Sequence, residues 1–320
     1  MRYLVTGGAG YVGGVVAARL LAAGHRVTVL DDLSTGFLAG VPEGAEFVEG
    51  RVQDAARWLD DSYDAVLHFA ACSQVGESVL DPEKYWRNNV AGTIELLAAM
   101  RGAGVRTLVF SSTAAVYGEP ASTPIVEDAV TAPTNPYGAS KLAVDQMITG
   151  ECAAQGLAAV SLRYFNVAGA LGAQGERHDP ESHLIPIVLQ VAQGRRESIS
   201  VYGADYPTPD GTCVRDYIHV DDLAEAHLLA LTAVAPGEHL ICNLGNGNGF
   251  SVRQVIEAAR EVTGHPIPET VADRRAGDPA VLVASAERAR ARLGWRPRRP
   301  ELADIIADAW AFAQREEPSA

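Results

Sequence analysis

Short apolar runs and longer amphipathic segments alternate along the first half of the chain. Apolar runs of this length, separated by helical segments, are typical of strands in a parallel sheet that helices cover on both faces. The pattern predicts five such strands, over residues 3–6, 27–30, 65–69, 107–110 and 158–162.

Two helical segments lie between these strands, over residues 11–23 and 90–100. We expect the first helix to stop at Gly24 and the second at Gly102, because glycine readily adopts the left-handed conformation that ends helices. Repeated alternation of strand and helix predicts an α/β fold built on a doubly wound parallel sheet.

The pattern is looser after about residue 165, where Gly- and Pro-rich stretches such as 203–211 separate the helices. Helices are expected over 221–232 and 301–314, and another from Ser251, which forms a capping-box pattern with Gln254. We predict a first domain over residues 1–165 and a smaller second α/β domain over residues 166–320. Within the second domain, the segment 214–245 is expected to return to the first.

The formal net charge of −14 excludes several classes of partner. Because 40 acidic residues face 26 basic ones, the average field repels nucleic-acid phosphates and anionic lipids, so we expect no nucleic-acid or membrane partner. No stretch approaches the roughly 20 apolar residues of a membrane span. Met1 leads directly into the first strand without a signal-peptide segment, which favours the cytoplasm.

Neither the cysteines nor the histidines predict a metal site. The four cysteines contain no C-x-x-C pair and fit small buried side chains in a reducing compartment: Cys72, Cys152, Cys213 and Cys242. The histidines follow no known ligand spacing, among them His178, His183, His219 and His227.

A glycine-rich turn follows the first strand, with the sequence Gly7-Gly8-Ala9-Gly10-Tyr11-Val12-Gly13. It satisfies G-x-x-G-x-x-G from Gly7 and G-x-G-x-x-G from Gly8. Between a strand and a helix, such glycines let a dinucleotide's diphosphate reach backbone amides, which predicts a Rossmann site. A turn that merely packs closely is the alternative.

Asp31 follows the second strand, at about the offset where a carboxylate binds the hydroxyls of the adenosine ribose. Its charge, reinforced by Asp32, would repel a 2′-phosphate, so NAD is favoured over NADP. A turn or capping role is the alternative for Asp31.

Tyr137 and Lys141 form a second motif, directly after Pro136, a residue suited to the first turn of a helix. Residues four apart share one helical face. A phenol, whose pKa in water is about 10, is a poor base until a nearby ammonium favours phenolate, and Lys141 would supply that charge. Thr113, after the fourth strand, could hydrogen-bond the reacting hydroxyl, with an ordinary turn hydrogen bond as the alternative.

The glycine-rich turn, the strand-end Thr113 and Tyr-x-x-x-Lys together resemble the extended short-chain dehydrogenase/reductase superfamily over nearly the whole chain. Within it, further stretches are similar to the UDP-hexose 4-epimerases, at residues 75–78, 88–90, 163–166 and above all 205–208 and 214–220.

This resemblance implies an NAD-dependent homodimer that interconverts UDP-glucose and UDP-galactose through a 4-keto sugar. Tyr137 takes the proton of the 4-hydroxyl while the C4 hydride passes to the nicotinamide. The keto sugar then turns and receives the same hydride on its other face. Another nucleotide sugar, such as UDP-glucuronate, and a non-catalytic NAD-binding sensor are the alternatives.

The resemblance also assigns site residues, position by position. The catalytic residues are Tyr137, Lys141 and Thr113. NAD is held by Gly7, Gly10, Tyr11, Val12, Gly13, Asp31, Asp32, Phe69, Ala70, Ala71, Asn88, Ser111, Tyr137, Lys141 and Tyr164. The UDP-sugar is held by Thr113, Tyr137, Asn166, His183, Leu184, Tyr202, Arg215, Tyr217, Arg275 and Asp278.

Some positions depart from relatives of the resembled family. Related dehydratases carry an acidic residue just after the Ser/Thr, where this chain has Ala114 and Ala115, so 4,6-dehydration has no evident proton donor. Arg51 replaces an acidic residue that binds adenine, so either adenine is held differently or Arg51 stacks on it. Ser73 replaces a cofactor-binding Lys. Leu282, smaller than the Tyr of some relatives, predicts some activity on N-acetylated UDP-hexoses.

Overall fold

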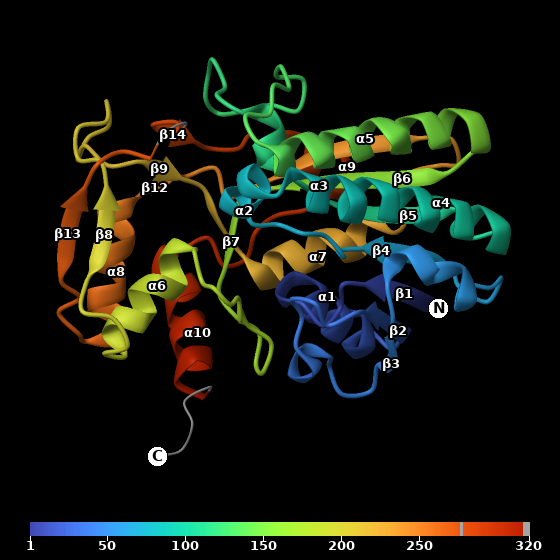
Figure 1. The fold of residues 1–320 in the computed structure, drawn as a ribbon, viewed down its shortest axis with the longest axis horizontal. Helices are drawn as coiled ribbons and strands as arrows, with labels where there is room; N and C mark the ends of the chain where they lie inside the picture. The colour runs from blue at the N-terminus through green and yellow to red at the C-terminus, as the bar shows by residue number, and fades with distance from the viewer. Residues whose placement is uncertain (276–277, 316–320) are drawn as a thin grey trace.

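The computed structural model describes residues 1–275 and 278–315, and its largest element is a seven-stranded parallel sheet (Figure 1). The strand order is β11-β6-β5-β4-β1-β2-β3, so the chain winds outward in both directions from the centre and the sheet is doubly wound. Its strands are β1(Arg2–Thr6), β2(Arg26–Asp31), β3(Glu46–Glu49), β4(Ala65–His68), β5(Thr107–Thr113), β6(Ala158–Tyr164) and β11(His239–Leu244).

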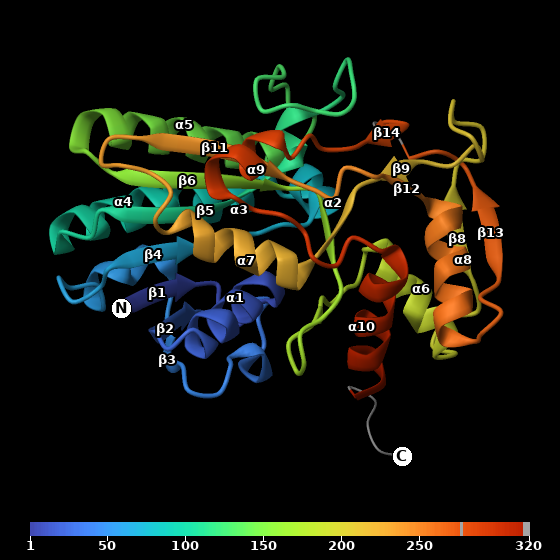
Figure 2. The same ribbon diagram turned by 180° about the vertical axis from the view of Figure 1, so that it is seen from behind.

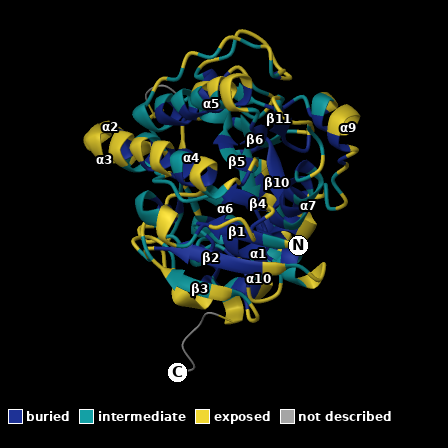
Figure 3. Cartoon of the chain, turned by 90° about the vertical axis from the view of Figure 1, so that its right-hand side faces the viewer, coloured by how far each residue is buried: buried dark blue, intermediate teal, exposed yellow. Residues whose placement is uncertain are grey.

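Helices cover both faces of this sheet (Figures 1 and 2). Leu4 of β1 packs in a core with α4 and α5, whereas its neighbour Val5 packs in a second core with α1, α7 and α9. Successive strand residues point to opposite faces, so two covered faces require uninterrupted apolar strands. The strands at the centre of the sheet are accordingly buried in Figure 3. The covering helices are α1(Tyr11–Ala22), α4(Gly92–Ala103), α5(Pro136–Gln155), α7(Val220–Ala230) and α9(Glu287–Leu293).

All five strands expected from the sequence are present, and β5 and β6 continue to Thr113 and Tyr164. The expected stop at Gly102 is wrong, because Gly102 lies inside α4 and the left-handed C-cap is Gly104, with φ of 75°. A helical glycine costs only about 1 kcal/mol relative to alanine, so the glycine that takes the left-handed conformation ends the helix. Before α4, the chain forms the short helices α2(Val75–Leu80) and α3(Pro82–Tyr85) and a π-helical turn, η3(Trp86–Ala91).

A smaller α/β part, built mainly from the second half of the chain, lies beside the carboxyl ends of the central strands (Figure 1). Its core joins three helices, and the capping box of Ser251 and Gln254 is confirmed at the start of α8. Within the described residues, none of the helices has the length and apolar character of a membrane span. The elements here are β7(Asn166–Ala168), α6(Leu184–Ala192), β8(Ile199–Tyr202), β9(Val214–Arg215), β10(Tyr217–His219), β12(Phe250–Ser251), α8(Val252–Thr263), β13(Glu269–Ala272), β14(Val281–Leu282) and α10(Leu302–Arg315).

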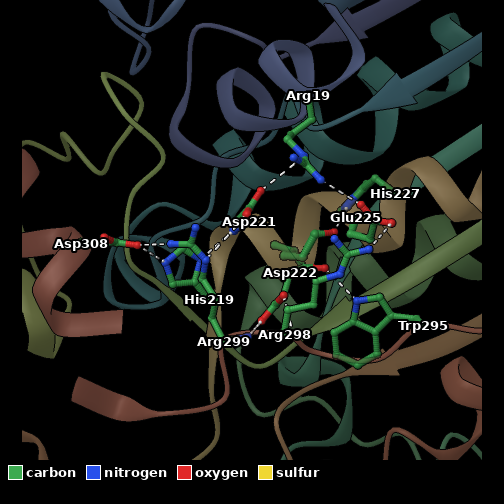
Figure 4. Close-up of polar contacts among 11 residues, drawn as sticks. Arg19, His219, Asp221, Asp222, Glu225, His227, Trp295, Arg298, Arg299 and Asp308 are labelled. Atoms are coloured by element: carbon green, nitrogen blue, oxygen red, sulfur yellow. Dashed lines mark hydrogen bonds and ion pairs between the residues drawn. The ribbon is translucent and has the colours of Figure 1, made fainter. Parts of the chain in front are cut away.

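Helix α7 connects the chain's late segments to its first helix (Figure 4). Arg19 of α1 forms ion pairs with Asp221 and Glu225 of α7, at 3.3 and 2.9 Å. Trp295 donates a hydrogen bond of 2.7 Å to the carbonyl of Asp222, whose carboxylate accepts two backbone N–H groups from the segment before α10. Since β11 follows α7 and pairs with β6, residues 217–244 contribute to both parts of the molecule. The division into two domains at residue 165 stays a prediction.

Candidate active site

A cleft of about 1380 Å³ runs from the glycine-rich turn across the carboxyl ends of the central strands to the smaller part of the molecule. Open α/β sheets bind their ligands at this edge. Every residue assigned to the cofactor, the substrate or the reaction from the sequence lines this cleft. The separate motifs therefore meet in one continuous space.

The three glycines of the G-x-x-G-x-x-G pattern line the cleft, and they need glycine for different reasons. Gly7 has φ of 73°, and a Cβ on Gly13 would lie 2.3 Å from the carbonyl oxygen of Gly7, so these two serve the turn itself. A Cβ on Gly10 would meet only that same oxygen, at 3.3 Å. Gly8 instead packs against Val29 of β2. Gly10 is thus the glycine whose missing side chain leaves room in the cleft.

The first turn of α1 offers unsatisfied backbone donors to this space. Its N-cap, Gly10, makes no side-chain capping hydrogen bond, and no acidic residue lies in the first turn. Tyr11, Val12 and Gly13 of that turn line the cleft. A helix N-terminus left open in this way attracts an anion, so these residues fit the diphosphate of NAD.

Asp31 accepts two backbone hydrogen bonds and also borders the space where the ribose of a dinucleotide would bind. Its carboxylate accepts hydrogen bonds from the backbone N–H of Ala9, at 3.0 Å, and of Leu33, at 2.9 Å, so it fixes the glycine-rich turn. Burial raises the pKa of Asp31, and these two N–H donors partly offset the rise. Asp31 and Asp32 both line the cleft beyond β2, where a ribose would lie.

Arg51 does not line the cleft, whereas its neighbours Gly50 and Val52 do. Arg51 is exposed at the start of a 3-10 turn, and Trp58 packs beneath Gly50. Of the two hypotheses for this departure, the structure therefore favours an adenine held by other residues over stacking on Arg51.

Helix α5 positions the Tyr-x-x-x-Lys motif at the end of β5. Pro136 occupies its first turn, and the Asn135 side chain caps it by accepting the N–H of Gly138 at 2.9 Å. The buried Lys141 donates from Nζ to the carbonyl oxygen of Ser111 at 2.7 Å. Burial lowers the pKa of Lys141 to about 8, with the Asp145 carboxylate acting in the opposite direction.

The expectation that Lys141 favours phenolate at Tyr137 stays a prediction. Burial raises the pKa of Tyr137, and a hydrogen bond with Thr113 only partly offsets the rise. Lys141 is directed at the Ser111 carbonyl and lies over the Phe110 ring, at 4.8 Å from its centroid.

Thr113 forms the ordinary turn bond weighed from the sequence, and its hydrogen bond to the reacting hydroxyl stays a prediction. Its hydroxyl accepts the backbone N–H of Ala115 at 3.2 Å, which is the ordinary turn bond, and it also hydrogen-bonds Tyr137. Tyr164 lies behind this group and hydrogen-bonds Ser111 and His227. Four other residues assigned to NAD line the same wall, and their side chains do not hydrogen-bond Tyr137: Phe69, Ala70, Ala71 and Asn88.

Two arginines lie in the half of the cleft formed by the smaller part. Arg215 of β9 donates from Nη1 to the carbonyl oxygens of Val214 and Pro279, at 2.9 and 2.8 Å, and from Nη2 to Asp278 at 3.3 Å. Arg275 stacks on the ring of Tyr202, at 4.0 Å from its centroid. Guanidinium groups held in this way are suited to an anionic diphosphate in a chain whose net charge is negative. The remaining predicted substrate residues complete the same walls: Asn166, His183, Leu184 and Tyr217.

A cluster of two glutamates and two histidines beside this wall was not expected from the sequence, although His183 alone was predicted as a substrate residue. Glu176, His178, Glu181 and His183 bring four potential metal-ligand atoms within 4.8 Å of one another. The expectation of no metal site was based on known histidine spacings alone. It overlooked clusters that combine histidines with glutamates. The available signal was the repeated pattern Glu-x-His-x-x-Glu-x-His within eight residues.

The chain is similar to known proteins over almost its whole length. The model of the NAD dependent epimerase/dehydratase family matches residues 3–245. A UDP-glucose 4-epimerase of Streptomyces lividans is 71% identical over 316 residues, covering 97% of this chain and 95% of the relative. That of Corynebacterium glutamicum is 58% identical over 314 residues, covering 98% and 95%.

Solved structures agree with these relatives. A crystal structure of a UDP-glucose 4-epimerase matches with a TM-score of 0.94 and 47% identity, covering 99% of this chain and 98% of that one. The enzyme of Bifidobacterium longum, crystallised with NAD+ and UDP, matches with a TM-score of 0.91 and 37% identity, covering 99% of each.

Proposed function

The chain belongs to the NAD dependent epimerase/dehydratase family, and on that premise we propose that it interconverts UDP-glucose and UDP-galactose by inverting carbon 4 of the hexose. One observation supports this most strongly. The helix N-terminus suited to a dinucleotide, the Tyr137–Thr113 pair and the two arginines suited to a nucleotide diphosphate all line one cleft.

The proposed reaction needs a proton acceptor at carbon 4 that also returns the proton. Tyr137, as phenolate, takes the proton of the sugar 4-hydroxyl, and as phenol it gives a proton back to the 4-keto oxygen. Thr113 holds that oxygen beside Tyr137. NAD, when held by the first turn of α1 and beside Lys141, would supply a positive charge near Tyr137 and a hydride acceptor and donor for C4. No net oxidation results.

The residues of the smaller part hold the substrate through the change of face. We assign the diphosphate to Arg215 and Arg275 and the uracil and ribose side to Asn166, Leu184 and Tyr202. Held at its diphosphate, the keto sugar can turn without leaving the cleft. Ala114 and Ala115 follow Thr113 directly, so no carboxyl group stands there to expel the 6-hydroxyl, which disfavours dehydration.

The test is the product formed by the purified protein. With UDP-galactose and no added cofactor, we expect NMR to show conversion to UDP-glucose and approach to the same mixture from either side. A 6-deoxy-4-keto product would identify a dehydratase. No conversion by protein that retains its NAD would support a sensor and contradict the proposal.

We also propose that the protein acts in the cytoplasm and as a homodimer. Exposed apolar side chains lie on the outer helices before and within α4: Val79, Leu80, Trp86 and Ile94, of which Leu80 is 86% exposed. Figure 3 shows α2 and α3 projecting from the molecule with exposed surfaces. Large apolar side chains exposed on consecutive helical segments support a protein interface on this side of the molecule. Sedimentation equilibrium should give twice the chain mass of 33.8 kDa.

A further inference from the structure

The segment between β7 and α6 brings two histidines and two glutamates together at one edge of the cleft. His178 Nδ1 and His183 Nδ1 each lie 2.9 Å from Oε1 of Glu176. His183 Nδ1 also lies 2.8 Å from Oε1 of Glu181. The two imidazole rings are 5.0 Å apart. Four donor atoms from eight consecutive residues therefore converge on one point.

The two carboxylates are shielded from water. The side chains of Glu176 and Glu181 are 9% and 5% exposed. Ionised carboxylates at this depth require compensating positive charge. In residues 1–275 and 278–315, the ion pairs found for these two carboxylates are with His178 and His183.

The separation of the donor atoms suits a tetrahedral zinc ion. Zinc binds imidazole nitrogen and carboxylate oxygen at about 2.0–2.2 Å, which sets neighbouring ligand atoms about 3.3–3.5 Å apart. The four atoms here are separated by 2.8 Å at the closest contact and by no more than 4.8 Å. Small side-chain adjustments thus open a central position, and two carboxylates neutralise the charge of the metal.

We propose that Glu176, His178, Glu181 and His183 bind one zinc ion, which clasps the two ends of this segment together at the edge of the cleft. Imidazole with carboxylate favours zinc over magnesium or calcium, which prefer oxygen ligands alone. The ion has no catalytic part in this proposal, because its four ligands leave no open position. The proposal does not depend on which sugar the enzyme accepts.

The clasp would affect both halves of the cleft. Glu176, His178 and His183 line it together with Tyr11. Burial and the negative charges of Glu176 and Glu181 raise the pKa of the Tyr11 phenol. Tyr11 lies in the first turn of α1, at the diphosphate site, and its hydroxyl donates to the carbonyl of Gly169 at 2.6 Å. Leu184, next to His183, begins α6 on the substrate side. The segment that the metal holds would therefore lie between the cofactor site and the substrate site.

The test is the zinc content and zinc affinity of the purified, NAD-retaining protein. After removal of loosely bound metal, we expect about one zinc per chain by mass spectrometry, and one equivalent regained after chelation and titration with zinc chloride. His178→Ala and Glu181→Gln should each weaken zinc binding by at least about 10-fold. His265→Ala, an exposed histidine outside the cluster, should bind zinc like the parent.

Two further readouts separate a zinc site from an ion-pair cluster. Cobalt added to the metal-free protein should give the intense visible bands of tetrahedral coordination, and these should be lost in His178→Ala. Zinc should slow amide hydrogen exchange over residues 173–183. Circular dichroism and NAD content verify that each variant is folded. Absence of zinc binding by the parent, equal binding by the folded variants, or exchange that zinc leaves unchanged would overturn the proposal.

Discussion

Gly10 and Gly13 belong to the same turn, yet the structure requires glycine at each for a different reason. At Gly13 an added Cβ would collide with the carbonyl oxygen of Gly7, at 2.3 Å. At Gly10 the backbone is extended and the nearest atom would be 3.3 Å away, so the glycine leaves space in the cleft instead. One substitution therefore tests the fold and the other tests the ligand.

We expect Gly10→Val to lower NAD affinity by at least about 10-fold, equivalent to about 1.4 kcal/mol, with little change in the stability of the cofactor-free protein. Gly13→Ala should instead lower the free energy of unfolding by about 1–3 kcal/mol, because backbone must move to admit the methyl group. Urea unfolding and NAD titration of both variants distinguish the two effects. Equal loss of stability in both would contradict this assignment.

Lys141 predicts a pH dependence of stability. Its pKa falls from 10.5 in the unfolded chain to about 8 in the fold because it is buried. Between those pH values the unfolded chain binds more protons, so the free energy of unfolding rises with pH; the full effect is on the order of 3 kcal/mol. Below about pH 8 the buried ammonium destabilises the fold.

The comparison with Lys141→Met isolates this contribution. In the cofactor-free protein, the free energy of unfolding of the parent should rise relative to that of Lys141→Met from about pH 8 to about pH 9.5. This window lies below the ordinary range of tyrosine titration. Urea unfolding at several pH values measures both stabilities, and a difference independent of pH would show that Lys141 is not buried as an ammonium.

At the scale of elements, a buried ion pair fixes the helix that carries the reacting groups. Asp145 of α5 accepts hydrogen bonds at 3.0–3.1 Å from Arg163 of β6 and at 3.1 Å from Ser112 of β5. The Arg163 and Asp145 side chains are only 4% and 2% exposed. One turn before Asp145 on the same helix lies Lys141, so this pair sets the position of the motif relative to the sheet.

Asp145→Asn should reduce the free energy of unfolding by about 3–5 kcal/mol, because it leaves the Arg163 charge buried without a partner. Glu151→Gln is the matched control, since Glu151 lies on α5 and pairs with Arg101 at the surface, where the loss should be about 0–1 kcal/mol. Chemical denaturation of both variants tests the difference. Similar losses would mean that the buried pair does not fix α5.

Features that are determined by neighbouring residues could be predicted from the sequence, whereas features that depend on contacts between distant segments could not. The central strands, the start of α5 at Pro136 and the capping box at Ser251 all have local patterns, and they are present. The edge strand β3 was not among the expected strands because two of its four residues are glutamates, and one face of an edge strand needs no apolar side chains. The direction of Lys141 toward Ser111 and the His–Glu cluster depend on how segments pack, which spacing alone does not show.

At the scale of the whole molecule, the cleft joins two parts that contribute different chemistry. The sheet supplies Tyr137 and Lys141, and the smaller part supplies the arginines and Leu282. Leu282 of β14 packs with Tyr117 and Phe165 at the edge of the cleft. Its size therefore bears on which sugar substituent the cleft accepts.

We expect the protein to convert UDP-N-acetylgalactosamine as well as UDP-galactose. Leu282→Tyr should lower kcat/KM for the N-acetylated sugar by about 10–200-fold, because the larger ring fills space needed by the acetyl group, and should change that for UDP-galactose only a few-fold. Parallel assays with both sugars measure the ratio. Complete inertness of the parent enzyme toward the N-acetylated sugar would refute this prediction.

The central claim is that Tyr137 exchanges the proton of the 4-hydroxyl while hydride moves between sugar and cofactor. It is tested most directly by stopped-flow absorbance of the NAD-loaded protein mixed with UDP-galactose. The parent should show a transient band of reduced nicotinamide, and Tyr137→Phe should retain NAD yet form that band about 100- to 10,000-fold more slowly. Reduction at the parent rate in Tyr137→Phe would contradict the account.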